Sequence, residues 1–171
     1  LTTTRVAKKA GVSVGSLYQY FPHKDALVAA LIERYMAQLR AAFMQVLQAT
    51  SALPLESLLE GILRMLAATL RAQGRGVHRP LLDKLSAVGL ARIAEANLEV
   101  YVDAMTAHLS QRADIRCENL RRLCWIMVNG ADGIGRALVV REDTSEDEAV
   151  IKDVTRMFLA LLRAESAGPA A

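Results

Sequence analysis

Apolar residues recur at helical spacing along most of the chain. After Lys24 they stand four residues apart, at Leu27, Leu31, Tyr35, Leu39, Phe43 and Leu47. This spacing places them on one face of a long helix that connects the start of the chain to the later helices. Similar patterns predict helices at 55–73, 78–88, 90–112, 117–140 and 146–164. The pattern predicts an all-α protein.

Two shorter helices are predicted before the long one. Residues 3–10 begin with threonines suited to capping a helix and stop at Gly11, and Ser13 is suited to cap a second helix that ends before Pro22. Two short helices joined by a tight glycine turn form a helix-turn-helix, here between Thr3 and Tyr20. Its internal seam is predicted to consist of Val6, Ala10, Val12 and Leu17. The outward positions are then Val14, Gly15, Ser16, Gln19 and Tyr20.

The predicted breaks between the later helices are short, so these helices should pack as neighbours in one bundle. Composition agrees, because 53% of residues are hydrophobic but only 5% are aromatic, which is typical of interlocking amphipathic helices rather than a β-sandwich. We therefore expect a helix-turn-helix head at residues 1–27, a helical body at 28–165 and a disordered tail at 166–171.

Charge is distributed unevenly. The whole chain has a formal net charge of +3, whereas residues 1–50 hold six lysines and arginines against two acidic residues. The basic excess therefore lies at one end of the molecule, where a polyanion could bind. A solvated basic face is the alternative, and charge alone does not exclude it.

The outward side chains suit contact with duplex DNA. The amide of Gln19 can make two hydrogen bonds to adenine, Ser16 can contact a base or a phosphate, and Val14 can touch a thymine methyl group. Hydroxyl groups and a cation suited to phosphates are supplied by Thr3, Thr4, Tyr18, Tyr20 and Lys24. A helix, a glycine turn and a helix also occur in plain bundles, but a corner of a bundle rarely carries two tyrosines and a phenylalanine next to a basic segment.

The run TTRVAKKAGVSVGSLYQYFPHK, residues 3–24, resembles the DNA-binding signature of the TetR family. The resemblance implies that Val14, Gly15, Ser16 and Gln19 face bases, and that Thr3, Tyr18, Tyr20 and Lys24 hold the backbone. Two positions depart from the family pattern: many relatives have Lys or Arg in place of Val14, and Ser or Asn in place of His23. His23 is expected to cap the following helix weakly or to contact phosphate. The first helix of the family would precede Leu1, so we expect a preceding stretch to be absent from this sequence.

The same resemblance implies a dimer built from the last two helices and a ligand cavity among the central ones. The candidate dimer residues are Leu123, Met127, Gly130, Ile134, Leu138, Val154, Met157, Phe158 and Leu161. Burial of these residues within one monomer is the alternative. The candidate cavity residues are Asn97, Tyr101, Met105, His108, Trp125 and Asn129, with apolar walls from Met36, Leu39, Phe43, Leu59, Ile62, Leu63 and Leu66.

Together these features predict a ligand-responsive transcriptional regulator. We expect a cytoplasmic homodimer that represses from a palindromic operator and is released by a small hydrophobic effector, with no cofactor and no membrane partner. An enzyme is the first alternative, but His23, His78 and His108 are far apart in sequence and no nucleophile stands beside a base. A helical adaptor that binds protein through Tyr18, Tyr20 and Phe21 is the second.

Overall fold

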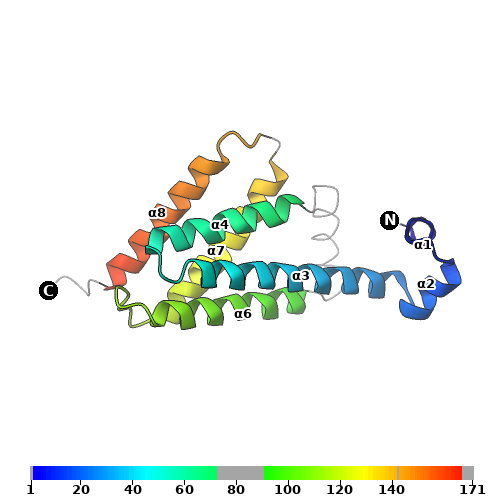
Figure 1. The fold of residues 1–171 in the computed structure, drawn as a ribbon, viewed down its shortest axis with the longest axis horizontal. Coiled ribbons are helices and arrows are strands. Elements are labelled where there is room, and N and C mark those ends of the chain that lie inside the picture. The colour runs from blue at the N-terminus through cyan, green and yellow to red at the C-terminus, as the bar shows by residue number, and fades with distance from the viewer. Residues whose placement is uncertain (1, 73–90, 142, 167–171) are drawn as a thin grey trace.

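The computed structural model describes residues 2–72, 91–141 and 143–166, and these residues form seven α-helices (Figure 1). In chain order the helices are α1 (Thr3–Ala10), α2 (Val14–Tyr20), α3 (Lys24–Ala49), α4 (Leu55–Ala72), α6 (Ala91–Ser110), α7 (Leu120–Val140) and α8 (Asp147–Ser166). The described residues contain no strand, so the all-α prediction is confirmed. None of the described helices is long and apolar enough to span a bilayer.

Helix α3 joins two parts of different character (Figure 1). Its C-terminal half packs between α4 and α6. Helix α7 packs on α4 and α6, and α8 packs on α4 and α7. Its N-terminal half extends away from the body and ends at the small head formed by α1 and α2 (Figure 1). The body therefore holds the head at the end of a 26-residue helix.

The core of the body is built from the apolar stripes that the helical spacing predicted. On α3 the buried side chains include Tyr35, Leu39, Phe43 and Leu47, at the predicted interval of four residues. The side chains that are almost completely buried include Leu58, Leu109, Leu123, Met127 and Leu162, from α4, α6, α7 and α8. Leu27 and Leu31 depart from the stripe, because Val28 and Ile32 are buried in their place. The stripe shifts by one residue because 3.6 residues per turn do not match an exact repeat of four.

Most predicted helices are found within a few residues of their predicted bounds. The main difference is at α7, which begins at Leu120 rather than at Cys117. The Cys117 thiol lies 3.2 Å from the Ser166 hydroxyl and 3.5 Å from the Leu162 carbonyl oxygen, so this segment packs against α8 as a loop. Helix α8 also includes Ser166, which the sequence assigned to the tail. The predicted helix at 78–88 and the rest of the tail lie outside the described residues.

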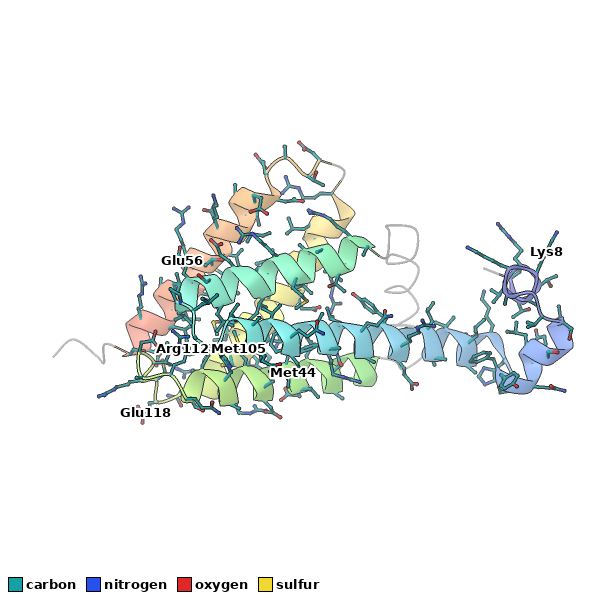
Figure 2. The ribbon with its side chains drawn as sticks, viewed as in Figure 1. Lys8, Met44, Glu56, Met105, Arg112 and Glu118 are labelled. Atoms are coloured by element: carbon teal, nitrogen blue, oxygen red, sulfur yellow. The ribbon has the colours of Figure 1, made fainter. Side chains whose placement is uncertain are left out.

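Charged side chains tie the body helices together at their ends. Arg112, after α6, donates to both carboxylate oxygens of Asp114 at 2.9 Å and to the Leu53 carbonyl oxygen at 3.0 Å. Figure 2 shows Arg112 at the end of the body far from the head. At the start of α8, the buried Asp147 pairs with Arg71 of α4. These contacts add polar anchors to the loops between the helices.

Candidate nucleic-acid interface

The head begins with a capped helix. The Thr2 hydroxyl accepts a hydrogen bond from the Arg5 backbone N–H at 3.4 Å, which satisfies one free donor at the start of α1. Lys8 and Lys9 lie in the last turn of α1, where positive charge is favourable next to the helix dipole. Figure 2 shows Lys8 at the outer end of the molecule, on the head.

Gly11 makes the turn between the two short helices. Its φ of 69° lies in the left-handed region, and its N–H and that of Val12 close the end of α1 on the carbonyl groups of Lys8 and Ala7. A Cβ atom added to Gly11 would meet nothing within 4 Å. Glycine is therefore required here by the backbone conformation and not by crowding.

The second helix is capped by Ser13 and tied to the first by a tyrosine. The Ser13 hydroxyl accepts from the Ser16 N–H at 2.9 Å and lies 2.9 Å from the Ser16 hydroxyl. The Thr3 hydroxyl on α1 lies 3.3 Å from the Tyr18 hydroxyl on α2. Two of the residues expected to hold phosphates thus stand side by side, one on each helix.

The outward face of α2 is exposed as the sequence spacing indicated. Val14, Gly15, Tyr18, Gln19 and Tyr20 are all exposed, and Tyr20 is 80% exposed. Thr4 and Lys24 are also exposed, while Thr3 and Ser16 are half-buried. The structure therefore brings the nine predicted DNA-binding residues to the surface of one small head, and their contacts with DNA stay a prediction.

The seam between α1 and α2 differs in part from the predicted one. Leu17 is buried and Val6 is half-buried, but Ala10 is exposed and Val12 is 45% exposed. The buried residue on α1 is Ala7. The left-handed backbone at Gly11 ends α1 directly before Val12, so the pattern of α1 cannot be extended through the turn to place that side chain.

His23 caps the helix that follows the head. Its Nδ1 accepts a hydrogen bond from the Ala26 N–H at 3.1 Å, which is the role that Ser or Asn side chains play at this position of a helix. The sequence left two roles open for His23, a helix cap or a phosphate contact, and the structure shows the cap. An Nδ1 that accepts cannot carry a proton, so the proton of the neutral ring is on Nε2.

Three basic side chains of the head were not among the predicted site residues. Arg5, Lys8 and Lys9 are all exposed on α1. The charge excess of residues 1–50 is the signal that points to them, because these three supply half of its six positive charges.

The body buries most of the predicted dimer residues inside the monomer. Leu123, Met127, Leu138, Val154 and Phe158 are all buried, and a Cβ atom on Gly130 would lie 3.6 Å from the Phe158 ring of the same chain. Ile134 and Leu161 are half-buried, and Met157 is 53% exposed. The five buried residues pack within the monomer, because α7 contacts α4 and α6 and α8 contacts α4 and α7.

Of the large apolar side chains that α7 and α8 expose, Met157 is a predicted dimer residue, whereas Trp125 and Ile126 are not. Trp125 is 49% exposed and Ile126 is also exposed on α7, and Met157 is exposed on α8. Trp125 was predicted to line the ligand cavity with Asn129, but Asn129 instead donates to the Trp125 carbonyl oxygen at 2.8 Å. Both residues belong to the outer face of α7, since Leu123 and Met127 occupy its inner face.

Among the cavities lined by the described residues of the body are two small ones. One of about 50 Å³ lies between α3, α4, α6 and α7, and one of about 20 Å³ lies next to α8. The larger is lined by Leu39, Phe43, Ile62, Met65, Leu66, Leu98, Tyr101, Val128, Ala131 and Asp132. The smaller is lined by Phe43, Leu59, Ile62, Leu63, Met105, Met127, Val128, Ala131 and Phe158. Eight of the residues predicted for the ligand site therefore line one cavity or the other.

The remaining predicted cavity residues lie outside these linings. The Asn97 amide nitrogen donates to the Tyr101 hydroxyl at 3.0 Å and lies 3.2 Å from the Met36 sulfur, so both Asn97 and Met36 stand behind Tyr101. His108 is half-buried and lines neither cavity; burial, with the nearby charge of Arg112, lowers its pKa. Asp132, which the sequence reasoning missed, lines the larger cavity and pairs with Arg136.

A line of polar contacts leads from this cavity to α3. The Arg40 guanidinium donates to the Asn97 side-chain oxygen at 2.8 Å, and Asn97 in turn holds the Tyr101 hydroxyl. Burial raises the pKa of Tyr101, and burial together with the charge of Asp132 raises the pKa of the neighbouring Tyr35 to about 12. Both phenols are therefore protonated near neutral pH.

Short stretches of curated proteins resemble part of this chain closely. The nucleoid occlusion factors SlmA of Haemophilus ducreyi and of Actinobacillus pleuropneumoniae serotype 5b are each 59% identical to this chain over 34 residues. That of Glaesserella parasuis serovar 5 is 56% identical over 34 residues. Each match covers 20% of this chain and 17% of the relative, so the chain matches about a sixth of the length of these proteins.

Family models match both parts of the molecule. The model described as bacterial regulatory proteins of the tetR family matches residues 1–31, which hold α1, α2 and the start of α3. The model described as a tetracyclin repressor-like C-terminal domain matches residues 54–162, which is more than half of the chain and covers the body from α4 into α8. The chain therefore belongs to the TetR family of transcriptional regulators, with a helix-turn-helix DNA-binding head and a helical C-terminal body.

Proposed function

We propose that this regulator acts as a homodimer on a twofold-symmetric operator, reading bases with the outward face of α2. The observation that carries the proposal is the exposure of Tyr18, Gln19 and Tyr20 on a head that stands clear of the body. Large aromatic side chains that gather on an exposed surface often mark an interaction site. A polar groove that receives their rings and hydroxyl groups accounts for their exposure.

The exposed residues divide into two roles. Gln19 and Val14 are placed to read base edges in the major groove, and Gly15 lets the α2 backbone approach the DNA closely. The hydroxyl groups of Thr3 and Tyr18, which lie together, are placed to hold one phosphate, and Lys24 is placed to neutralise another. Ser16 is the least available of these residues for a base contact, because its hydroxyl already lies 2.9 Å from the Ser13 hydroxyl.

Dimerisation is proposed through the exposed faces of α7 and α8. Trp125, Ile126 and Met157 are large apolar side chains on these two helices, and burying them against a second copy would remove them from water. A dimer of this kind places two heads on one DNA duplex, so the operator should be palindromic. A regulator of chromosomal DNA works in the cytoplasm, and that is where we place its action.

Regulation is proposed to be repression relieved by a small molecule in the body cavities. The cavities lie against α3, the helix that carries the head, so a ligand that favours another position of α3 would change the spacing of the two heads. A coupling of about 1 to 3 kcal/mol changes DNA affinity roughly 5- to 150-fold, which is enough to switch a promoter.

The DNA-reading proposal is tested with duplexes selected from a random pool by the purified protein. Gln19→Ala is expected to change the preferred base at its position, with a cost of about 1 to 3 kcal/mol for the original sequence. Lys24→Ala is expected to weaken binding to all duplexes by a similar factor, because a phosphate contact carries no sequence information. Lys152→Ala, at an exposed lysine on α8, is the matched control and should leave both properties unchanged.

A protein that selects no common sequence would refute base reading by α2. If Gln19→Ala keeps the base preference of the wild type, Gln19 does not read a base. Binding to a protein partner that is insensitive to salt, with no DNA binding, would favour the adaptor alternative.

A further inference from the structure

The two ends of α2 present different chemistry. Its last three residues, Tyr18, Gln19 and Tyr20, are exposed and carry hydroxyl or amide groups. Its first two residues are Val14 and Gly15, and neither has a side chain that can form a hydrogen bond. The Val14 side chain is nevertheless 37% exposed. Helix α2 therefore begins with an apolar surface and ends with a polar one.

The hydroxyl groups closest to the apolar end of α2 are engaged with each other. The Ser13 hydroxyl oxygen accepts a hydrogen bond from the Ser16 N–H at 2.9 Å, and the two hydroxyl groups lie 2.9 Å apart. Both hydroxyl groups are thus held in the cap of α2. The surface that remains at this end is formed by Val14 and the bare backbone of Gly15.

The major groove of DNA offers one group that matches an apolar side chain. Base edges present hydrogen-bond donors and acceptors there, together with the methyl group on C5 of thymine. 5-Methylcytosine carries a methyl group on the same ring atom. A donor or acceptor pressed against Val14 would lose its water and gain no partner, which is costly. A C5-methyl group in contact with Val14 has no such cost.

The position of Val14 suits contact with a base. In a helix-turn-helix, the N-terminal residues of the second helix contact the base edges, and Val14 is the first residue of α2. A valine side chain is short, so such a contact requires the backbone of α2 to come close. The neighbouring Gly15 allows this, because a Cβ atom there would meet only the Ser13 hydroxyl oxygen of the described chain, at 3.7 Å, and would otherwise project outward.

From these observations we propose that Val14 recognises the C5-methyl group of one pyrimidine in each operator half-site. The protein therefore distinguishes thymine from uracil, and 5-methylcytosine from cytosine, at that position. Methylation of a cytosine there raises the affinity of the site. The inference rests on the proposed function, since it names the chemical group that the start of α2 recognises.

The first arm of the test removes the methyl group from thymine. It uses the full chain and the duplex selected from the random pool, with each thymine of a half-site replaced in turn by uracil, which pairs with adenine in the same way. Uracil at one thymine is expected to weaken binding about fourfold, and about 15-fold when both half-sites carry it, because one buried methyl group is lost per half-site. Fluorescence anisotropy at constant salt gives the Kd.

The second arm adds the methyl group to cytosine. Cytosine or 5-methylcytosine, each opposite guanine, is placed at the position where uracil weakens binding. The exchange of the base pair itself affects both duplexes equally. The duplex with 5-methylcytosine should therefore bind about fourfold more tightly per half-site than the duplex with cytosine. Equal affinities would overturn the proposed sensitivity to methylation.

Variants of the protein assign the effect to one side chain. Val14→Ala removes the methyl groups that reach the base, and alanine suits a helix, so the protein should fold and should bind the thymine and uracil duplexes equally. Val14→Ile keeps a branched apolar side chain and should keep the preference for thymine. Lys24→Ala is the matched control, because loss of a phosphate contact should weaken both duplexes by the same factor. Thermal unfolding checks that each variant is folded.

The proposal is overturned if uracil is tolerated at every thymine of the selected duplex, or if Val14→Ala still distinguishes thymine from uracil. Selection of a common duplex tests the proposed function, whereas the uracil series tests the recognition of the methyl group. A protein that selects a duplex but tolerates uracil throughout loses this inference alone. One that selects no duplex loses the proposed function, and this inference with it.

Discussion

At the scale of single residues, the head uses its two glycines for different reasons. Gly11 needs its left-handed backbone, with a φ of 69°. Gly15 lies inside α2, and a Cβ atom there would come only within 3.7 Å of the Ser13 hydroxyl oxygen, an ordinary contact. The fold of the described residues therefore gives no reason for glycine at position 15, whereas the proposed close approach of the α2 backbone to DNA would give one.

The substitution Gly15→Ala should accordingly have opposite effects on folding and on binding. Alanine in a helix is more stable than glycine by about 0.5 to 1 kcal/mol, so the free energy of unfolding should rise or stay constant. Affinity for the selected duplex should fall about tenfold, as expected for loss of about 1.4 kcal/mol of backbone contact. Thermal unfolding and fluorescence anisotropy measure the two quantities, and undiminished DNA affinity would contradict close approach at this residue.

At the scale of elements, the bounds of most helices could be predicted from the sequence, but for α7 and α8 the side that is buried could not. Capping and breaking residues such as Ser13, Gly11 and Pro22 act locally, so α1, α2 and α3 could be predicted closely. The outward face of α2 could also be predicted, because a short helix at the surface has only one apolar side to bury.

The faces of α7 and α8 could not be predicted in the same way. Helix α7 carries apolar side chains on two sides, with Leu123 and Met127 buried and Trp125 and Ile126 exposed. Spacing shows that both sides are apolar but does not show which one meets α4 and α6. The start of α7 was missed for a related reason, since Cys117 is held by contacts to α8 that are 45 and 49 residues away in sequence.

The ends of the body elements depend on Arg112, and this dependence should change with pH. Its guanidinium holds the pKa of Asp114 below the ordinary value of 3.8. Because the folded state lowers the pKa of Asp114, its ionised carboxylate stabilises the fold above pH 3.8. This contribution to the free energy of unfolding is lost as the pH falls through the lowered pKa. Because the Asp114 side chain is 55% exposed, the pair contributes at most about 1 kcal/mol.

Arg112→Ala should therefore lower the free energy of unfolding by about 1 to 2 kcal/mol at neutral pH, since the Leu53 carbonyl oxygen also loses its donor. Asp114→Asn should lower the free energy of unfolding by less than Arg112→Ala at neutral pH. The free energy of unfolding of Asp114→Asn should also fall less between neutral and acid pH than that of the wild type. Denaturant unfolding of the three proteins between pH 7 and pH 3 measures this. Parallel pH profiles for wild type and Asp114→Asn would show that the pair does not contribute.

At the scale of the whole molecule, the proposed binding to a palindromic operator requires two copies of the chain joined through the body. The sequence offers a matched pair of methionines for testing this, since Met157 on α8 is 53% exposed and Met44 on α3 is 54% exposed. Figure 2 shows Met44 on the side of the body formed by α3 and α6. Only Met157 belongs to the proposed dimer face.

Met157→Asp should weaken the dimer about 30-fold or more, because it buries a charge at a site where loss of a central side chain costs about 2 kcal/mol. Met44→Asp should leave the dimer intact. Sedimentation of both variants over a range of concentrations gives the dimer dissociation constants. Equal behaviour of the two variants would place the dimer interface elsewhere.

The most direct test of DNA binding by the exposed head is the salt dependence of binding to the selected duplex by the wild-type protein. We expect two protomers per duplex and a dissociation constant that rises steeply with salt, since each head presents several cations to phosphates. Lys24→Ala, present in both protomers, should reduce the slope of log affinity against log salt by about 2, or about 1 per head. Binding by a single protomer, or an affinity that does not change with salt, would contradict the account.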